Sequence, residues 1–550
     1  MIKKSLLFSL AILLSMAILA NAANDIVGYW DISILYGDRQ SDSKINITKD
    51  DKGQMAATWT TSRGSTNLTD VKFDNNKLTF TMKRNRGQQE FISTYEGTLS
   101  GNNLKGTMKS TRGSTTANGT RGTATSKPKQ IPPESADDLK PVRTEEITPL
   151  HIDTFNDNGK YRQRKQGGNP RKVSGYLLFD GSMDGNRQVD PQIAVGGGYV
   201  LHGTNNGLII YDKGGNFVQG VSQNRFNGGI DPKLFFDPHN KVFGFDLWQY
   251  WDKAKTKPVN VSISETSDPK GPWNTYPVPA PGGVDGGAIG YSKKWIGYSF
   301  PGGPEQTFIM KMAQAKAGKK ATVYHFPGSL GLPVMTQDDI EDLYFFKLSG
   351  PFFIINCITD GGDGNPVCKQ VAATEHKLKY IGWPPQSPQK GTTQKTSSGD
   401  RNPKNLILQN GCIWFSQAIN CQGKSAVQWH QLKLDGTIIQ TGLISDPTTN
   451  YIQTTIAVNK NEDVLVGFQE TNENMFISPR LAFRKASDPK GTLREIVKLG
   501  EGKAATDGVA WGDYSGSCVD ADNMLDLWTI QSITDEKGKG DTVIVKVPMK

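Results

Sequence analysis

Charged and aromatic residues recur directly ahead of short apolar strands in the second part of this 550-residue sequence. The first such segment, Asp190–Thr204, contains an Asp-Pro, an apolar strand, a glycine turn and a second apolar strand, and six further segments follow this plan. The residues that precede the seven first strands are Asp190, Asp231, Asp285, Asp342, Arg401, Tyr451 and Asp513. Carboxylates that converge in one place raise each other's pKa values, bind a cation such as Ca²⁺, or accept hydrogen bonds from sugar hydroxyls.

A plainer interpretation is that each of these residues only closes its own turn. Asp-Pro and Asp-Gly are ordinary turn openers, and an Asp side chain readily accepts a hydrogen bond from a nearby backbone N–H. A shared site requires that the seven segments surround one axis, whereas turn capping does not. The two interpretations stay open at the level of sequence.

The spacing of the segments is compatible with a common axis. They recur at intervals of about 40 to 65 residues, in the range where self-similarity indicates propeller blades or solenoid repeats. Each contains a hairpin, further strands follow, and no helical period lies between them, which favours a β-propeller over residues 173–550. We expect seven blades, with six as the alternative because the fourth segment is irregular. The stretch Ser174–Phe179 is a candidate strand of the last blade that would close the ring.

The residues before the propeller divide into three parts, and the whole chain is expected to be all-β. Residues 1–23 contain two lysines, an apolar core and Ala20-Asn21-Ala22, which is typical of a signal peptide cleaved near Ala22 and predicts a periplasmic or secreted protein. Residues 24–124 alternate apolar and polar side chains between short turns, which predicts an up-and-down barrel of about eight strands. Residues 125–172 are Pro-rich and basic, which predicts a flexible linker.

Composition narrows the classes of partner. The net charge is +9 and falls to +7 once Lys3 and Lys4 are removed, which is too mild to indicate a nucleic-acid partner. No other apolar run is long enough to span a membrane. Residues 384–404 are rich in Pro, Gln, Ser, Thr and Lys without a strand signal, and such a loop is either a lid or disordered.

The sequence assigns no metal site and requires no cofactor. It contains neither CxxC nor HExxH spacing. Asp360–Asn365 and Asp180–Asn186 have closely spaced oxygen ligands that suit Ca²⁺, but both lack EF-hand spacing, and a plain glycine turn is the favoured interpretation. Asp520–Asn523 is interpreted as a hairpin turn.

All five cysteines lie in the second half of the sequence. Cys357 and Cys368 flank one turn, and Cys412 and Cys421 flank another hairpin-like segment. In an oxidising compartment these are candidates for two local disulfides, with Cys518 left free. Buried unpaired thiols are the alternative, because free Cys is among the most buried residue types.

Two parts of the sequence resemble known families. Gly28-Tyr-Trp30 and Gly119-Thr-Arg121 resemble the ends of a small lipocalin-like barrel, which implies that Arg121 covers Trp30 in a structural role. Thr266–Trp273 and Ala486–Leu493 resemble degenerate Asp boxes, the hairpin turns of sialidase-like propellers. Together with Trp511–Gly516 and Ile456–Phe468, they make the second part similar to secreted bacterial propellers related in fold to sialidases. This resemblance implies structural roles for Asp268 and Asp488.

Two functions follow from these features. The favoured one is non-catalytic binding of a carbohydrate, or of an envelope or extracellular protein, at the propeller funnel. The funnel is the mouth of the central channel, where the residues that precede the inner strands converge. The alternative is an exo-glycosidase of the sialidase type, which needs three arginines for the substrate carboxylate, an acid, and a Tyr nucleophile. The candidates for that set are Arg187, Arg225 and Arg401, with Glu341 and with Tyr344 or Tyr514. No Phe/Tyr-Arg-x-Pro sialidase opening is present.

Overall fold

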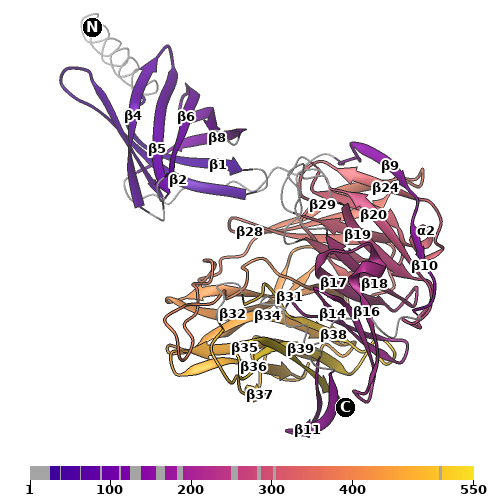
Figure 1. Cartoon of the computed structure of the whole chain (residues 1–550). Coiled ribbons are helices and arrows are strands. Elements are labelled where there is room, and N and C mark those ends of the chain that lie inside the picture. The colour runs from indigo at the N-terminus through magenta and orange to yellow at the C-terminus, as the bar shows by residue number, and fades with distance from the viewer. Residues whose placement is uncertain are drawn as a thin grey trace, which may run out of the picture. The chain divides into compact units, whose positions relative to one another are not determined.

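The computed structural model describes residues 25–36, 39–61, 64–86, 89–110, 113–123, 138–155, 167–181, 190–248, 258–280, 287–300, 305–506 and 511–549. These residues fall into two compact units, one with the barrel and one with the propeller sheets (Figure 1). Strands dominate, and the helices of the described part are η1 (Gln223–Phe226) and α2 (Met312–Lys316), so the all-β prediction is confirmed. None of the helices in this part is long and apolar enough to cross a bilayer. The predicted signal peptide lies outside the described residues.

The first unit is a closed barrel of eight antiparallel strands, as predicted. Its strands are β1 (Gly28–Tyr36), β2 (Arg39–Lys49), β3 (Met55–Thr61), β4 (Gly64–Asp74), β5 (Lys77–Arg86), β6 (Gln89–Ser100), β7 (Asn103–Ser110) and β8 (Gly113–Arg121). Closure by the β1–β8 pairing sets Trp30 opposite Arg121. The Arg121 guanidinium lies 4.5 Å from the ring centre of the buried Trp30, so the predicted structural contact is confirmed. Buried apolar side chains from all eight strands fill the interior.

The second unit contains five separate sheets of four or five strands, and each of them is a blade. The first blade in the chain has β13 (Gln192–Gly196), β14 (Tyr199–Thr204), β15 (Gly207–Asp212) and β16 (Phe217–Ser222), and the next has β17 (Ile230–Asp237), β18 (Val242–Trp248), β19 (Pro258–Ser264), β20 (Trp273–Pro279) and β10 (Leu150–Ile152). The third has β25 (Leu332–Pro333), β27 (Leu343–Ser349), β28 (Phe352–Asp360) and β29 (Pro366–Glu375). The fourth has β34 (Asn450–Val458), β35 (Val464–Asn472), β36 (Met475–Arg484) and β37 (Val497–Lys498), and the fifth has β38 (Gly516–Val519), β39 (Leu527–Thr534), β40 (Gly540–Val547), β12 (Tyr176–Asp180) and β11 (Gly168–Val173).

A sixth sheet of this unit has ten strands and is not a separate blade. The prediction of seven blades, or six, is therefore wrong, because the structure has five separate blades. Its order is β33 (Ile438–Ile444), β32 (Lys424–Lys433), β31 (Cys412–Cys421), β30 (Leu406–Gln409), β26 (Met335–Thr336), β21 (Ala288–Tyr291), β22 (Trp295–Ser299), β23 (Thr307–Lys311), β24 (Ala321–Phe326) and β9 (Arg143–Ile147). Two of the predicted repeats share this sheet because β26 pairs in parallel with both β21 and β30.

The ring closes where the sequence predicted it. Strand β12 pairs with β40, with Phe179 opposite Ile544. The last blade therefore combines strands from both ends of the propeller sequence, and in Figure 1 the C-terminus lies near β11 of the same sheet. Joining the two ends in one sheet leaves neither as a free edge at that position.

The predicted flexible linker, residues 125–172, is wrong in part. Strand β9 pairs with the outer edge of β24, β10 pairs with β20, and β11 pairs with β12. The edges of the sheets offer unpaired N–H and C=O groups, and these take up the added strands. Residues 125–137 and 156–166 of this segment lie outside the described part.

Both predicted disulfides are wrong, because all five cysteines are free thiols. Cys368 lies opposite Ile358 in the β28–β29 pair, and neighbours along a strand point to opposite faces, so Cys357 faces away from Cys368. Cys412 and Cys421 occupy the two ends of β31, roughly 30 Å apart at 3.3 Å per residue. Neither pair can approach to bonding distance.

Candidate functional site

Three of the predicted carboxylates lie together where β13, β17 and the segment before β38 begin. Asp190 is 1% exposed, and its Oδ1 accepts a hydrogen bond of 2.7 Å from the backbone N–H of Asp513. Its Oδ2 accepts a bond of 3.2 Å from Asn205, and Asn205 Oδ1 accepts one of 2.7 Å from the Asp231 N–H. We call this end of the propeller the funnel. One hydrogen-bonded chain therefore connects three segments that are far apart in the sequence.

The backbone is irregular at this end of β17. Asp231 has φ of 55°, in the left-handed region that few non-glycine residues adopt, and the β17–β18 register shifts between Ile230 and Lys233. The same combination occurs in β34, where Gln453 has φ of 49° within a register shift between Ile452 and Thr455. Such bulges re-aim side chains and often lie beside functional sites.

A buried lysine and a fourth carboxylate lie close to these residues. Lys233 is 2% exposed and lies opposite Asp246 across the β17–β18 pair. Its Nζ lies 3.5 Å from the ring centre of Tyr514, whose hydroxyl donates to the Pro232 carbonyl at 3.1 Å. The Tyr298 hydroxyl lies near Asp246, yet neither Asp246 oxygen has a partner of hydrogen-bond geometry among the described residues. A buried carboxylate without such a partner is costly.

Burial and mutual repulsion shift the titration of this cluster. Burial, followed by repulsion from Asp231 and Asp513, raises the pKa of Asp190 to about 7. Burial also raises the pKa of Asp246 to about 7, although Lys233 opposes that shift. Burial lowers the pKa of Lys233 to about 8. The side chains of Asp190, Asp246 and Lys233 therefore gain or lose their protons close to neutral pH.

The solvent-facing part of the funnel carries further charged groups. Asp513 is exposed, and the carboxylate of Asp400 lies 3.2 Å from the Lys404 ammonium. Attraction to Asp400, Asp513 and Asp190 raises the pKa of Lys404 despite its burial. One exposed carboxylate, Asp513, and one mostly buried ion pair, Asp400–Lys404, thus lie near the buried cluster.

The central channel below the funnel is narrow. Its cavity has a volume of about 20 Å³ and is lined by inner-strand residues that include Gln192, Leu234, Tyr291, Met335 and Cys518. Such a space holds about one water molecule. A sugar-sized ligand therefore does not fit inside the channel.

Several predicted residues lie elsewhere. Asp342 precedes β27, whereas the strand at the inner edge of that blade is β25. Its neighbour Glu341 lies beside Lys294, at the turn between β21 and β22, where the Glu341 carbonyl accepts from Ser292. That turn is at the end of the inner strands opposite the funnel, so Asp342 does not join Asp190. Residues Asp285 and Arg187 lie outside the described residues.

The remaining predicted residues make other contacts. Arg401 donates to the Ile381 carbonyl at 3.1 Å and lies 5.3 Å from the ring centre of Trp383. Tyr451 packs edge-on against Phe468, and burial raises its pKa to about 12. Arg225 lies in η1, before β17. Burial raises the pKa of Tyr344, which lies near Cys357.

Sequence reasoning missed Lys233, Asp246, Asn205 and Lys404. Lys233 and Asp246 could have been found, because Asp246 is the one charge in β18 and Lys233 lies between the apolar residues Pro232 and Leu234 of β17. Asn205 follows β14 in a turn, where an Asn is unremarkable by itself. Only its position in space makes it a bridge between Asp190 and Asp231.

The described residues contain no group of three or more His, Cys, Asp or Glu that could hold a metal ion. In the Asp360–Asn365 turn, Asp360 Oδ1 accepts from the N–H groups of Gly362 and Gly364, and Asp363 accepts from that of Asn365. Its oxygens therefore close a glycine turn. Residues 182–189, which include most of the other acidic turn, lie outside the described part.

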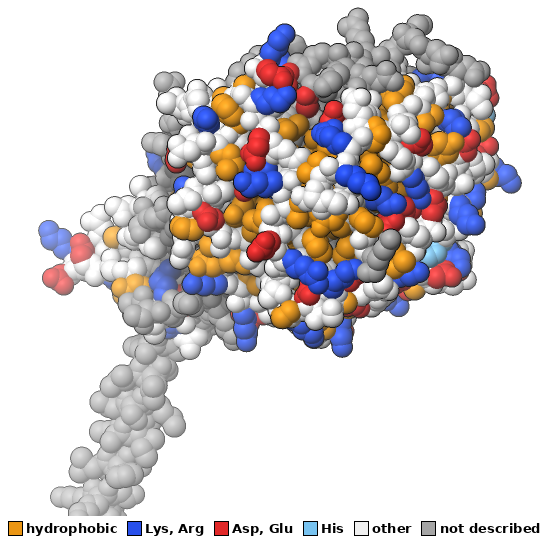
Figure 2. All heavy atoms as spheres, turned by 90° about the horizontal axis from the view of Figure 1, so that it is seen from below, with side chains coloured by type: hydrophobic (Ala, Val, Ile, Leu, Met, Phe, Trp, Pro, Cys, Tyr) orange, Lys and Arg blue, Asp and Glu red, His pale blue; other side chains and the backbone are white. Residues whose placement is uncertain are grey.

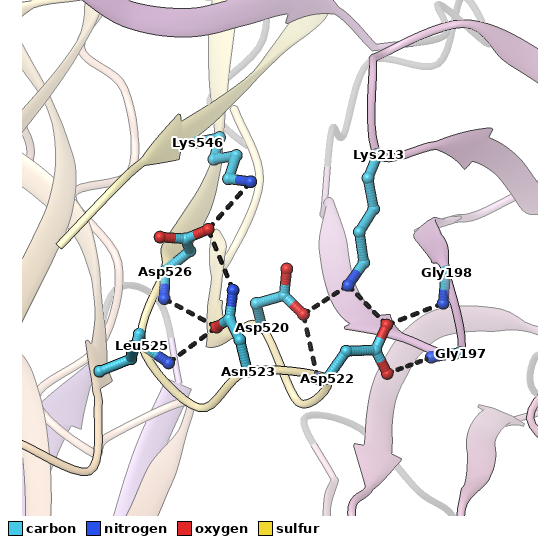
Figure 3. A network of polar contacts seen from close by, with 9 residues as sticks. All are labelled: Gly197, Gly198, Lys213, Asp520, Asp522, Asn523, Leu525, Asp526 and Lys546. Carbon is cyan, nitrogen blue, oxygen red and sulfur yellow. Dashed lines mark hydrogen bonds and ion pairs between the residues drawn. The ribbon is translucent and has the colours of Figure 1, made fainter. Parts of the chain in front are cut away.

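The turn after β38 lies at the other end of the inner strands, and Figure 3 shows its contacts. Asp522 accepts hydrogen bonds of 2.8 Å from the N–H groups of both Gly197 and Gly198, in the turn after β13. The Lys213 ammonium lies 2.6 Å from Asp520 and 2.5 Å from Asp522. The Asp520–Asn523 segment is a hairpin turn, as predicted, and it joins two neighbouring blades.

The two Asp-box-like turns use their carboxylates within the turn. Asp268 accepts from the Lys270 N–H at 3.1 Å, and Asp488 accepts from the Lys485 N–H at 2.9 Å. Arg494 donates two further hydrogen bonds to Asp488. The bonds from Arg494 and from the Lys485 N–H lower the pKa of the Asp488 carboxyl to about 2. Both residues thus have structural roles.

Charge is mixed over the surface drawn in Figure 2. On this face, hydrophobic side chains gather near the middle, and Lys and Arg are interspersed with Asp and Glu around them. Neither sign of charge covers the face. This agrees with the modest net charge of the sequence.

No family model and no curated protein sequence matches the chain. Solved structures similar to it include a quinonprotein alcohol dehydrogenase-like protein from Bacteroides thetaiotaomicron, with 9% identity, TM-score 0.31, and coverage of 79% of this chain and 97% of that one. A protein of unknown function from Dyadobacter fermentans has 10% identity, TM-score 0.35, and coverage of 76% and 99%. A subtype N10 neuraminidase-like protein of A/little yellow-shouldered bat/Guatemala has 10% identity, TM-score 0.30, and coverage of 58% and 100%. Similarity of this size carries no argument about function.

Proposed function

We propose that this protein is a non-catalytic carbohydrate-binding protein whose ligand lies at the funnel. The observation that carries the proposal is the exposed Asp513, whose backbone is held by the buried Asp190, beside the Asp400–Lys404 ion pair. An exposed carboxylate beside a partly exposed ion pair suits the hydroxyl groups of a sugar, which both donate and accept hydrogen bonds. A backbone held in place before binding lowers the entropy cost of association.

The buried cluster supports binding rather than hydrolysis. A glycosidase acid must reach the glycosidic oxygen. Asp190 is 1% exposed and Asp246 is 0% exposed. Neither carboxylate therefore faces a ligand at the surface. The sialidase alternative also needs three arginines at one carboxylate; Arg225 lies in η1, Arg401 lies over Trp383, and Arg187 lies outside the described residues. In this proposal the protein acts after export through its signal peptide, in the periplasm or outside the cell.

The test is thermal unfolding of the protein lacking residues 1–23 against neutral and acidic mono- and oligosaccharides, with Ca²⁺ and EDTA arms. A sugar present at 100 times its Kd stabilises the folded state by about 2.7 kcal/mol. Asp513→Asn should abolish the shift in Tm. Asp435→Asn is the matched control, because Asp435 is an exposed carboxylate that accepts from Thr437 in the turn after β32.

Three results would contradict the proposal. A shift that survives Asp513→Asn moves the site away from the funnel. Release of a reducing sugar from an oligosaccharide would establish hydrolysis instead. If no sugar shifts Tm, the funnel does not bind carbohydrate, and a protein partner becomes the hypothesis to test.

A further inference from the structure

The segment from Lys377 to Lys404, here called the basic loop, is fastened to the propeller. Ser387 and Thr396 form a backbone bridge across it, and both are fully buried. The side-chain amide of Gln389 donates to the Thr506 carbonyl at 3.0 Å and accepts from the Thr506 N–H at 2.9 Å. Residues 384–404 of this segment were predicted to be either a lid or disordered, and these contacts order them.

Further contacts attach the basic loop along its length. The Lys390 N–H donates to the Met475 carbonyl at 3.1 Å, and the Pro388 carbonyl accepts from Thr471 at 2.9 Å. Gly382 bridges to Asn420 at the end of β31. The loop therefore presents its outward side chains from a fixed backbone.

The outward side chains are cationic and aromatic. Trp383 is 43% exposed, the one aromatic residue among the large, clearly exposed hydrophobic residues of the described part. Arg401 lies over its ring at 5.3 Å, Lys379 lies over Tyr380 at 5.0 Å, and Lys390 lies over Phe476 at 5.2 Å. The loop contains six Lys and Arg residues against a single acid, Asp400.

We infer that the basic loop binds an anionic oligosaccharide, of the uronic-acid type, that continues into the funnel. An exposed Trp packs on the apolar face of a sugar ring, and a guanidinium held beside it pairs with a carboxylate in a planar, bidentate way. The Ile381 carbonyl holds Arg401 in position for that pairing. This inference rests on the proposed function and names the class of its ligand.

The position of the loop in the chain explains why a sugar suits it better than a nucleic acid. Asp400 directly precedes Arg401 and pairs with Lys404 at 3.2 Å, and Lys404 in turn is close enough to Asp513 and Asp190 for their charges to act on it. A continuous polyphosphate has no hydroxyl groups to donate to these carboxylates. A saccharide can place its acid group at Arg401 and its hydroxyls at Asp400 and Asp513.

The experiment is calorimetric titration with oligogalacturonate of about six residues, and with the same oligomer methyl-esterified so that its carboxylates are neutral. Trp383→Ala and Arg401→Gln should each weaken binding of the acidic oligomer about tenfold. The ester should bind the wild type about as weakly as the acid binds Arg401→Gln. Raising NaCl from about 50 to 500 mM should weaken wild-type binding more than that of Arg401→Gln.

Matched controls are Leu443→Ala, at an exposed apolar residue of β33, and Lys433→Gln, at an exposed lysine at the end of β32. Neither should change affinity for the oligomer. Melting curves for every variant exclude loss of fold as the cause of lost binding.

The outcomes separate this inference from the proposed function. If Asp513→Asn abolishes binding while both loop variants bind normally, the funnel binds sugar and the inference about the loop is overturned. Equal affinity for acid and ester also overturns it. Equal affinity for oligothymidylate and oligogalacturonate makes the loop a general polyanion site and overturns the choice of a saccharide. If no saccharide of either kind binds, both proposals fail.

Discussion

At the scale of single residues, buried acids govern how the protein responds to pH. Burial raises the pKa of Asp246 from 3.8 to about 7. Between these two values the folded state therefore holds one more proton than the unfolded state. Stability contributed by this group must fall as the pH rises from 3.8 to about 7, and stay constant above that window. Asp190 acts in the same direction.

Asp246→Asn should remove this pH dependence. Asn has the shape of the protonated acid but cannot ionise, so the variant avoids a loss of about 1.4 kcal/mol for each pH unit in the window. In urea unfolding at pH 4, 6 and 8, the free energy of unfolding of the variant should increase relative to that of the wild type as the pH rises. Parallel curves for the two proteins would show that Asp246 already ionises freely in the fold.

Two histidines oppose this trend at acidic pH. Burial lowers the pKa of His202 and of His430 to about 3, from an unfolded value of 6.5. The unfolded state takes up protons first, so stability is lost as the pH falls below 6.5. The pH test is therefore a comparison of Asp246→Asn with wild type at each pH, in which the histidine contribution cancels.

The sequence placed some residues of the funnel and missed others for a physical reason. Asp190, Asp231 and Asp513 were located because a ring of similar hairpins brings equivalent positions together. Arg401 occupies an equivalent position, but the Trp383 ring and the Ile381 carbonyl draw its long side chain away. Position in a repeat predicts where a backbone lies, whereas a flexible side chain follows its local partners.

At the scale of elements, carboxylates at the end opposite the funnel bind turns of other segments. Asp522 binds the N–H groups of Gly197 and Gly198, and Asp338 binds those of Asn410 and Gly411 at 2.8 and 2.7 Å. Gly197 has φ of 57°, and a Cβ atom there would lie 2.1 Å from the Ser267 carbonyl oxygen. In each of these two contacts, here called clasps, a carboxylate of one segment accepts hydrogen bonds from two backbone N–H groups in a turn of another.

Asp522→Ala should destabilise the propeller by about 2 kcal/mol. It removes two charge-assisted hydrogen bonds and one partner of Lys213, and the side chain is 39% exposed, so solvent reduces the loss. The measurement is the urea midpoint of the propeller transition. Asp435→Asn serves as the control, since its carboxylate bonds only within its own turn in the described contacts. A midpoint shift in Asp522→Ala no larger than in the control would mean that the clasp is not stabilising.

The number and edges of the sheets were less predictable than their hairpins. Apolar alternation and turn residues identify a hairpin locally, and the barrel and inner hairpins were found in this way. Strand β26 has two residues and pairs in parallel with segments on either side, so nothing local reveals it. Strands β9 and β10 likewise become strands through the edges they cover.

At the scale of the whole molecule, closure of the ring and burial of the thiols determine how well the fold protects its cysteines from reaction. Strand β12 joins β40, so the propeller is closed without a covalent link between its ends. All five thiols are free, and four of them are buried. A protein that reaches an oxidising compartment with free thiols must keep them from reacting.

Burial supplies that protection, and it can be measured by thiol titration. The reactive species is the thiolate. Burial raises the pKa of Cys357 and of Cys368 to about 12, and raises that of Cys518 as well. We expect protein prepared without reductant to react slowly with Ellman's reagent when folded, and to show five thiols per chain in denaturant. Three thiols or one in denaturant would reveal disulfides, and would contradict the strand positions that hold these cysteines apart. Rapid reaction of the folded protein would show that its blades open often enough to expose the core, and closure through β12 would then be too weak to protect an exported chain.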